Sequence, residues 1–458
     1  MTASQVAYDL LTAGKTLEQI VDGDKKSYVM QYIDWKHIEN NAFHVVEEFA
    51  VSRTGMSDTY RPDIVLFVNG IPLCVIECKR PDIKDSLKQA ISQHLRNQKE
   101  DGIRSLYVYS ALLLATNVNE VSYATTATPE KFWSKWTEQF TDKNAEELYR
   151  YKVAEKVTEK RINPKMFSER YSYVRTDIEK KYDASLTPSV QDAYIYNLCR
   201  PERLLGLMYG FTLYDDGIKK VARYQQFFAV EKVMERIRNI EGDSRRGGVI
   251  WHTQGSGKSL TMVWLAQWIR ENVEDARVVI ITDRDELDKQ IENGFKDAGE
   301  QIKRATSGDK LIGMLNAAEP WLICSLIHKF GNKNDGETIS VGGKKATKSL
   351  DLYLEELAKS LPAAFRAKGN IFVFIDGCHR TQGGMLHEAM KHIMGNDVML
   401  IGFTGTPLLH TDKKKSIETF GSYIHSYKFN EAVEDGVILD LRYEARNVEQ
   451  YLGKREKI

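Results

Sequence analysis

The segment from Gly248 to Leu260 constrains the fold of this chain more than any other part of the sequence. A short apolar run, Gly248 to Trp251, leads into the turn Gly255-Ser256-Gly257 and then into Lys258-Ser259, after which an apolar helical pattern begins. A strand, a glycine-rich turn and a helix in this order predict a phosphate-binding loop in a parallel α/β sheet. A turn without a ligand is the competing interpretation, and His252 stands where the general motif has a glycine.

Each residue of this loop suits one part of a bound nucleotide. Gly255, Ser256 and Gly257 allow backbone N–H groups to close around phosphate oxygens at the start of a helix. Lys258 is expected to neutralise the β- and γ-phosphates, and the Ser259 hydroxyl is expected to bind Mg²⁺. The loop therefore predicts ATP and Mg²⁺ as ligands.

Apolar runs of strand length recur after the loop, separated by segments of helical length: Arg277 to Thr282, Trp321 to Ser325, Ile371 to Ile375 and Val398 to Thr404. This alternation is typical of a parallel α/β sheet. Upstream, Asp63–Asn69 and Ile71–Cys78 are β-rich runs joined at Asn69-Gly70, which predicts a hairpin. We expect a mixed-sheet domain over residues 1–130, a helical connector over 131–220 and the parallel-sheet domain over 221–458.

Two further motifs stand at predicted strand ends. Asp376 follows the run Ile371 to Ile375, where a carboxylate can hold Mg²⁺ through water. Thr404 and Thr406, around Gly405, follow the next run and can sense the γ-phosphate. Taken alone, the aspartate is equally well a helix cap and the threonines a turn, but both follow the phosphate-binding loop in series.

The ordered motifs resemble the motor domain of superfamily 2 helicases and translocases, over about Val221 to Tyr443. Three segments resemble more specifically the restriction (motor) subunit of type I restriction-modification enzymes: Trp251–Ser259, Ile281–Arg284 and Phe420–Tyr427. The resemblance implies a RecA-like fold for the parallel-sheet domain. It also implies Gln226 as an adenine contact and His379 as an ATP-binding member of an Asp-Glu-x-His box.

Two departures from the family pattern change the expected chemistry. Gly377 stands where the box has its glutamate, which normally orients and deprotonates the attacking water. We therefore expect Mg-ATP binding to persist while hydrolysis is strongly impaired. The sequence also stops at Ile458, before the second motor domain of the family, so we do not expect this chain to translocate by itself.

The predicted hairpin carries a second candidate site. Asp63 begins one strand, and Glu77 and Lys79 end its neighbour on one face, which gives a Pro-Asp…Glu-x-Lys pattern. The two carboxylates suit Mg²⁺, and Lys79 suits the charge that builds up on a cleaved phosphodiester. A hairpin with a charged edge would show the same residues. In the family, however, a restriction-endonuclease-like nuclease domain of this pattern precedes the motor.

The same resemblance implies a Gln-x-x-x-Tyr element on the following helix. Gln93 matches its first position, whereas Asn97 stands at the tyrosine position and leaves that match in doubt. Glu47 and Glu48, which we place in a preceding helix, either add a metal ligand or are simply solvated.

DNA contacts are expected where strands of the motor domain end. Arg284 and Lys329 suit salt-sensitive contacts to the phosphodiester backbone, although either can equally be a surface cation. Lys+Arg and Asp+Glu both number 64, so net charge gives no support for nucleic-acid binding. We find no sequence-reading motif, so a separate specificity subunit would have to recognise the DNA site. The resemblance implies double-stranded DNA and the methyltransferase and specificity subunits of a type I complex as partners.

The remaining features are those of a cytoplasmic enzyme. No apolar run approaches the roughly 20 residues of a membrane span, and an export signal is missing. The 5 cysteines are scattered without metal-ligand spacing. The leading hypothesis is a DNA-cleaving, ATP-dependent translocase subunit. The alternatives are another helicase–nuclease of repair or phage defence, and an ATP-binding scaffold without turnover.

Overall fold

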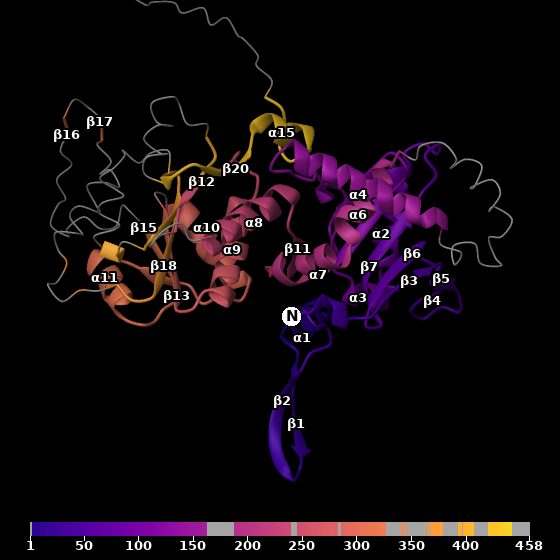
Figure 1. Ribbon diagram of the computed structural model, residues 1–458, viewed down its shortest axis with the longest axis horizontal. Helices are drawn as coiled ribbons and strands as arrows, with labels where there is room; N and C mark the ends of the chain where they lie inside the picture. The colour runs from indigo at the N-terminus through magenta and orange to yellow at the C-terminus, as the bar shows by residue number, and fades with distance from the viewer. Residues whose placement is uncertain are drawn as a thin grey trace, which may run out of the picture.

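The computed structural model contains two α/β bodies joined by helices, with the N-terminal body and the phosphate-binding domain side by side (Figure 1). The structure describes residues 2–162, 187–239, 245–282, 285–326, 340–341, 344–345, 361, 365, 367–378, 393–395, 397–406 and 420–441. Within these residues, no helix is both long and apolar enough to cross a membrane.

The N-terminal body is built on a mixed sheet with the strand order β3-β6-β7-β8-β9. Its strands are β3 (Phe43–Glu47), β6 (Ile64–Val68), β7 (Ile71–Cys78), β8 (Leu112–Thr116) and β9 (Val121–Ala124). Only β7 and β8 pair in parallel, and the helices α2 (Ser86–Asn97) and α3 (Arg104–Tyr109) lie in the crossover between them. The predicted hairpin is confirmed, with Asn69 and Gly70 at φ 51° and 81° in its turn.

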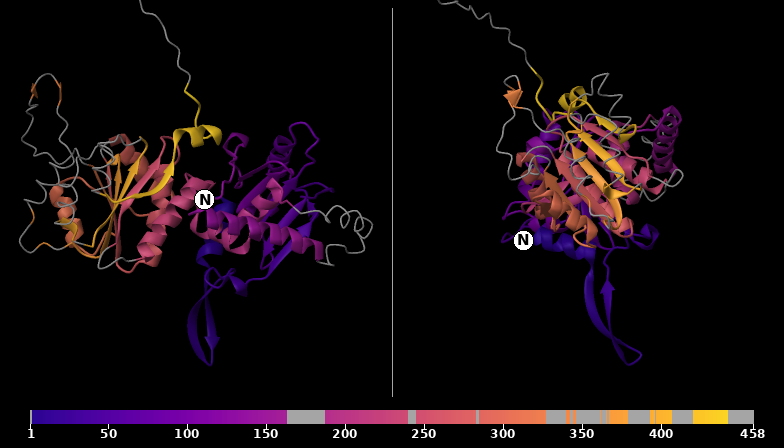
Figure 2. Two further views of the ribbon diagram at one scale, coloured as in Figure 1. Left: turned by 45° about the horizontal axis from the view of Figure 1, so that its top comes forward. Right: turned by 90° about the vertical axis from the view of Figure 1, so that its left-hand side faces the viewer.

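A separate hairpin projects from this body. The strands β1 (Lys15–Val21) and β2 (Asp24–Met30) follow the helix α1 (Ala3–Ala13) and pair only with each other. Figures 1 and 2 show the hairpin extending away from the rest of the molecule. It exposes several large apolar side chains, including Ile20 and Val29.

The connector is only partly helical. Its helices α4 (Lys143–Ile162), α6 (Val190–Cys199) and α7 (Pro201–Gly210) confirm the sequence interpretation. The expectation is wrong for residues 212–221, which form the hairpin β10 (Thr212–Asp215) and β11 (Ile218–Val221). Asp216 and Gly217, both at positive φ, make its turn, and Asp-Gly is a strong hairpin signal that outweighed the helical surroundings.

The phosphate-binding domain is a seven-stranded, wholly parallel sheet with the order β14-β15-β13-β18-β19-β12-β20. Its strands are β12 (Gly248–His252), β13 (Ala276–Thr282), β14 (Lys303–Ala305), β15 (Leu322–Leu326), β18 (Asn370–Asp376), β19 (Met399–Thr404) and β20 (Tyr423–Tyr427). The described helices around it are α8 (Tyr224–Arg238), α9 (Lys258–Asn272), α10 (Asp285–Asp297), α11 (Gly308–Asn316) and α15 (Phe429–Glu434). The five predicted strands and the predicted fold class are confirmed.

One hydrophobic core links the two bodies. It runs from Ile76 in the N-terminal sheet through Trp136 and Phe227 to Ile250 and Phe374 in the parallel sheet. Buried apolar surface of this extent favours a fixed arrangement of the bodies over free motion about a linker.

A buried arginine reinforces this core. Arg203 in α7 forms a salt bridge with Glu138 at 2.9 Å, and its guanidinium stacks on Trp136, Phe227 and Phe228. The connector therefore packs as part of the core, and its position relative to the parallel sheet is well defined.

Candidate nucleotide and nuclease sites

The phosphate-binding loop lies between β12 and α9, as the sequence predicts. Gly255 and Gly257 have φ of 82° and 85°, which glycine adopts without steric cost. A Cβ at Gly257 would meet the end of the Gln226 side chain, so a larger residue there would displace that amide and would also be strained at this positive φ. The Ser256 hydroxyl donates to the Thr253 carbonyl at 2.6 Å and closes the turn.

Lys258 is largely buried beneath this loop. Its Nζ donates to the carbonyls of His252 and Thr253 at 3.2 and 3.4 Å. Burial lowers the pKa of this ammonium, and the charge of Asp376 opposes that effect. Within the described part of the chain, no carboxylate forms a salt bridge with Lys258. Asp376 acts on this largely buried ammonium without a direct ion pair, and its hydrogen-bond partners are neutral carbonyls. A bound anion would therefore stabilise it further, so the residues present fit a triphosphate.

The strand order brings the other predicted residues to the same edge of the sheet. The strands β18, β19 and β12 are neighbours in the sheet. Asp376 and Thr404 are the last residues of β18 and β19, so they lie near the loop, at the edge where parallel sheets bind ligands. Thr406 N–H donates to Thr404 Oγ1 at 3.3 Å. A Cβ at Gly405 would lie 3.2 Å from Lys258 Nζ, which shows how closely this turn approaches the lysine.

Gly377 adopts a conformation that suits glycine. Its φ is 73°, and its N–H lies 2.9 Å both from Asp376 Oδ1 and from the Phe403 carbonyl. The turn therefore holds the Asp376 carboxylate but supplies no side chain for an attacking water.

Gln226 lies against the loop, and its role as an adenine contact stays a prediction. Its Oε1 accepts from Arg223 N–H at 2.9 Å, and its Nε2 donates to the Gly257 carbonyl at 3.0 Å. In this structure the amide thus supports the loop backbone. Three predicted residues, His379, Arg284 and Lys329, lie outside the described residues.

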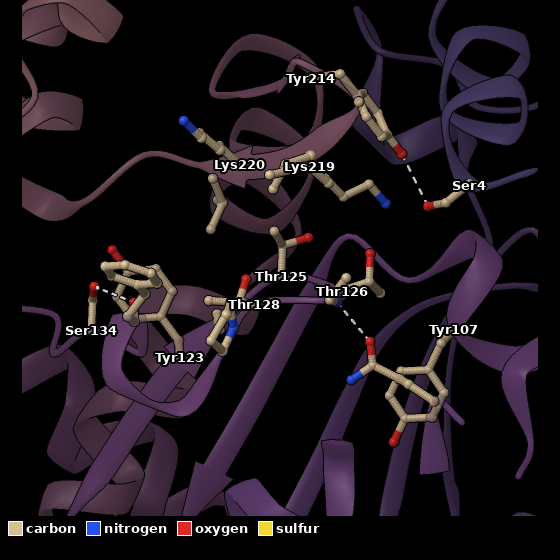
Figure 3. Close-up of a pocket in the computed structure, with 18 of the residues that line it drawn as sticks. Ser4, Tyr107, Tyr123, Thr125, Thr126, Thr128, Ser134, Tyr214, Lys219 and Lys220 are labelled. Carbon is tan, nitrogen blue, oxygen red and sulfur yellow. Dashed lines mark hydrogen bonds between the residues drawn. The ribbon is translucent and has the colours of Figure 1, made fainter. Parts of the chain in front are cut away.

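A cavity of about 830 Å³ adjoins the loop at Gln226 and Gly255–Gly257. Figure 3 shows Thr125 and Thr126 of the N-terminal body on one side and Lys219 and Lys220 of the β10–β11 hairpin on the other. Five cations and no carboxylate occur among the described residues that line it: Lys99, Arg104, Lys219, Lys220 and Arg223.

The cation Lys219 is the most buried member of this set. Its Nζ donates to the Ser110 carbonyl at 3.0 Å, and burial lowers its pKa to about 7. The sequence analysis missed this basic cavity, although two adjacent lysines after an Asp-Gly turn were a usable signal.

The second site forms where β6 and β7 pair in the N-terminal sheet. Asp63 Oδ2 accepts from the Cys78 N–H at 2.6 Å and lies 3.7 Å from Lys79 Nζ. Glu77 is fully buried beside it. The structure thus brings together the three residues of the Pro-Asp…Glu-x-Lys pattern.

Two amides of α2 hold the Glu77 carboxylate. Gln93 Nε2 donates to Glu77 Oε2 at 2.6 Å, and Asn97 Nδ2 donates to Glu77 Oε1 at 3.3 Å. Asn97 therefore contacts the site even though it differs from the tyrosine of the related element.

The electrostatics of this site favour a cation. Burial and the neighbouring Asp63 carboxylate raise the pKa of Glu77 to about 8, although Lys79 opposes the shift. Two adjacent carboxylates, one of them buried, are costly to ionise without a counterion. A divalent cation bound between Asp63 and Glu77 would stabilise both charges, so these residues fit Mg²⁺.

The expectation for Glu47 and Glu48 is wrong in its secondary structure. Glu47 ends the strand β3, and Glu48 follows it at φ 45° with its N–H donating to the Asp63 carbonyl at 3.0 Å. Across the described residues, no group of three or more histidine, cysteine, aspartate or glutamate side chains could hold a metal.

Together, the fold and the two sites define a parallel-sheet domain with a P-loop on one chain with a carboxylate-bearing mixed-sheet domain. Residues 225–458, just over half of the chain, match the model of the SWI2/SNF2 ATPase family, and the chain belongs to this family. Residues 1–132 match the model of the type I restriction enzyme R protein N terminus. The resemblance seen in the sequence motifs is confirmed.

Curated relatives extend the match across both domains. The putative type I restriction enzyme MjaIXP endonuclease subunit of Methanocaldococcus jannaschii is 28% identical over 98% of this chain and 39% of its own length. The type I restriction enzyme HindI endonuclease subunit of Haemophilus influenzae is 27% identical over 96% of this chain and 38% of its own length. The chain thus spans about two fifths of these relatives.

Solved structures show weaker likenesses. The Sulfolobus solfataricus SWI2/SNF2 ATPase core in complex with dsDNA has 16% identity and a TM-score of 0.30, over 50% of this chain and 40% of that chain. A nuclease-deletion mutant of the Type ISP enzyme LlaGI with a DNA substrate mimic has 14% identity and a TM-score of 0.32, over 48% and 21%. Our fold assignment rests on the strand order of the two sheets and not on these likenesses.

Proposed function

We propose that this chain binds Mg-ATP at the phosphate-binding loop and cleaves DNA at the Asp63–Glu77 site, as the endonuclease and translocase subunit of a type I restriction enzyme. The proposed nucleotide site is supported mainly by Lys258, because its largely buried ammonium has backbone carbonyls as its described hydrogen-bond partners. Asp376 and Ser259 are proposed to hold Mg²⁺, which would neutralise phosphate charge when bound. The basic cavity of Figure 3 would receive the nucleoside end of the ligand, beside Gln226.

Hydrolysis by this chain is proposed to be slow. Gly377 offers no carboxylate to orient or deprotonate water, although its N–H holds Asp376 in place. A positioned general base contributes roughly a hundredfold to ten-thousandfold in rate. Binding and turnover should therefore separate at this residue.

The nuclease site is proposed to act through the groups that converge at the end of the β6–β7 hairpin. Asp63 and Glu77 would hold Mg²⁺, which polarises a phosphodiester when bound. Gln93 and Asn97 hold the Glu77 carboxylate in position. Lys79, whose Nζ lies 3.7 Å from Asp63 Oδ2, would stabilise the negative charge that develops on the scissile phosphate.

The proposed partners are double-stranded DNA and the methyltransferase and specificity subunits of a restriction complex, in the cytoplasm. Arg284 and Lys329 are proposed to contact the DNA backbone. Co-purification with those subunits would separate this role from that of another helicase–nuclease. Gly377 favours a second candidate function, an ATP-binding scaffold without turnover.

The proposal is tested by measuring Mg-ATP binding and hydrolysis on the same sample of the chain. We expect a saturable calorimetric titration with Mg-ATP and little release of phosphate. Absence of binding would contradict the proposed nucleotide site, and rapid ATP hydrolysis would contradict the proposal that Gly377 makes hydrolysis slow.

A further inference from the structure

Three polar side chains link the connector to the phosphate-binding loop. Gln139 precedes α4 in the connector, His425 lies in β20, and His252 ends β12. His425 Nε2 lies 2.6 Å from Gln139 Oε1, and His425 Nδ1 lies 2.8 Å from His252 Nε2. Both imidazoles are buried. We name Gln139, His425 and His252 the imidazole chain.

The amide of Gln139 fixes the direction of both hydrogen bonds. An amide oxygen only accepts, so His425 Nε2–H donates to Gln139 Oε1. A neutral imidazole has one donor and one acceptor, so His252 Nε2–H donates to His425 Nδ1. Burial lowers the pKa of His425 to about 3 and that of His252 well below its usual value. Both rings are therefore neutral near pH 7.

The loop end of the imidazole chain supports the phosphate-binding lysine. The carbonyl of His252 accepts from Lys258 Nζ at 3.2 Å, and the next residue, Thr253, donates its N–H to the Tyr427 carbonyl at 2.9 Å. The ring of His252 and the carbonyl used by Lys258 thus belong to one residue.

We propose that Gln139, acting through His425 and His252, positions the loop peptide and the Lys258 ammonium for phosphate binding. The inference rests on the proposed nucleotide binding and goes beyond it, because it makes nucleotide affinity depend on the connector. Gln139, His425 and His252 are positioning residues, since they act on the phosphates through Lys258.

The surroundings of the imidazole chain make its protonation testable. Lys232 and Lys258 are the cations that act on the two rings, and Tyr427 packs edge-on against His252. In the described part of the chain, no carboxylate forms a salt bridge with either ring. Gln139→Glu would place one beside His425 Nε2 and raise the pKa of that imidazole. An imidazolium has two donors, so its Nδ1–H would then face the donor of His252.

The first experiment measures Mg-ATP affinity of wild type and Gln139→Glu from pH 8 to pH 5. The ratio of the two dissociation constants cancels the titration of the nucleotide itself. We expect the dissociation constant of Gln139→Glu, divided by that of wild type, to rise roughly tenfold as the pH falls. A tenfold change corresponds to a difference of about one unit in the pKa of His425 between the free and the nucleotide-bound protein. A flat ratio, with wild type binding normally, would overturn the inference alone. Absence of wild-type binding would overturn the proposed function and the inference with it.

The second experiment separates the donor of His252 from the bulk of its ring. His252→Gln keeps an N–H donor near Nε2, whereas His252→Leu removes it and leaves the buried acceptor of His425 without a donor. We expect His252→Leu to weaken Mg-ATP binding by roughly tenfold and His252→Gln to restore most of it. Equal affinities for the two variants would overturn the inference.

A control and a spectroscopic readout complete this test. Glu146→Gln removes a charge and the salt bridge to Arg150 from the connector helix α4, outside the imidazole chain, and should leave affinity unchanged. In ¹⁵N NMR of the histidine-labelled chain, His252 and His425 should both carry their proton on Nε2. A proton on Nδ1 of either ring in the wild-type chain would contradict the proposed direction of the hydrogen bonds.

Discussion

At the residue scale, Gly377 and Glu77 set the chemistry of the two sites. Gly377 has φ 73°, where a residue with a Cβ is strained by about 1 kcal/mol or more. Its N–H holds the Asp376 carboxylate, so the turn preserves a Mg²⁺ ligand while it lacks a general base. Glu77 is a buried carboxylate, and burial and the Asp63 charge oppose its ionisation unless a cation binds beside it. Each residue therefore makes a specific prediction.

Gly377→Glu should raise ATP turnover by at least about a hundredfold in a protein that also carries the second motor domain, with nearly unchanged nucleotide affinity. The reason is that the new carboxylate can serve the attacking water. Gly377→Ala carries similar backbone strain without a carboxylate and is the matched control. Equal steady-state ATPase rates for the two variants would show that another residue positions the water.

Without Mg²⁺, the stability of the protein should fall as the pH rises through the titration of Glu77. The folded pKa is about 8 and the ordinary value is 4.5, so the folded protein binds the extra proton between these values. The stabilisation is complete below pH 4.5 and lost above about pH 8. Urea unfolding of wild type and Glu77→Gln measures this difference.

The wild-type protein should lose up to a few kcal/mol relative to Glu77→Gln over that range. Added Mg²⁺ should restore stability to wild type above pH 8 and have little effect on the variant. Parallel pH curves for the two proteins without metal would rule out the carboxylate pair as the cause.

At the scale of elements, prediction from the sequence was most accurate for strands and turns that follow from a local residue pattern. Five of the seven strands of the parallel sheet, and the loop after β12, follow from apolar runs and glycine spacing. The meeting of Asp376 and Thr404 with the loop follows from parallel topology. By contrast, the basic cavity joins segments more than 80 residues apart, such as Thr125 and Lys219, and no local pattern reveals such a contact.

The β10–β11 hairpin and the imidazole chain show the same limit. The hairpin had a local Asp-Gly signal, but the helical pattern on both sides obscured it. Gln139 and His425 are separated by 286 positions, and their contact depends on how the connector packs against the edge strand. Such long-range contacts are decided by packing of the whole chain.

Lys219→Met should stabilise the protein by about 1–3 kcal/mol at pH 7. Burial lowers the folded pKa of Lys219 to about 7 from 10.5, so the unfolded chain binds the extra proton between these values. The gain should be largest at and below pH 7 and disappear as the pH approaches 10.5. Thermal unfolding across this range checks the prediction.

Lys220→Met is the matched control for that experiment. Lys220 is adjacent in the hairpin but forms a salt bridge with Asp215 and is partly exposed. Its replacement should give no gain in stability. Equal gains from both variants would show that burial of Lys219 is not the cause.

At the scale of the whole molecule, two chemically distinct sites share one continuous core. The carboxylate pair lies in the N-terminal sheet, the phosphate-binding loop lies in the parallel sheet, and apolar residues such as Trp136 pack between them. Such packing couples the stability of the two bodies, while each site keeps its own separate set of functional residues. Variants at one site should therefore leave ligand binding at the other intact.

Asp63→Ala, Glu77→Ala and Lys79→Ala should each abolish DNA cleavage in the assembled restriction complex, because each removes a metal ligand or the charge beside the phosphate. Their affinity for Mg-ATP should stay within about twofold of wild type, as expected for independent sites. Cleavage and nucleotide titrations on the same preparations check both parts. Normal cleavage by all three variants would mean that the hairpin residues are only structural.

The central claim is that Lys258 binds the phosphates of Mg-ATP, and calorimetric titration of wild type and Lys258→Ala with Mg-ATP tests it most directly. The ammonium is largely buried and its described hydrogen-bond partners are the neutral carbonyls of His252 and Thr253, so bound phosphates would supply a counter-charge in direct contact with it. We predict saturable binding to wild type and at least a roughly tenfold loss in the variant, the size of a charge-assisted hydrogen bond. Unchanged affinity in Lys258→Ala, with the fold intact, would contradict the account.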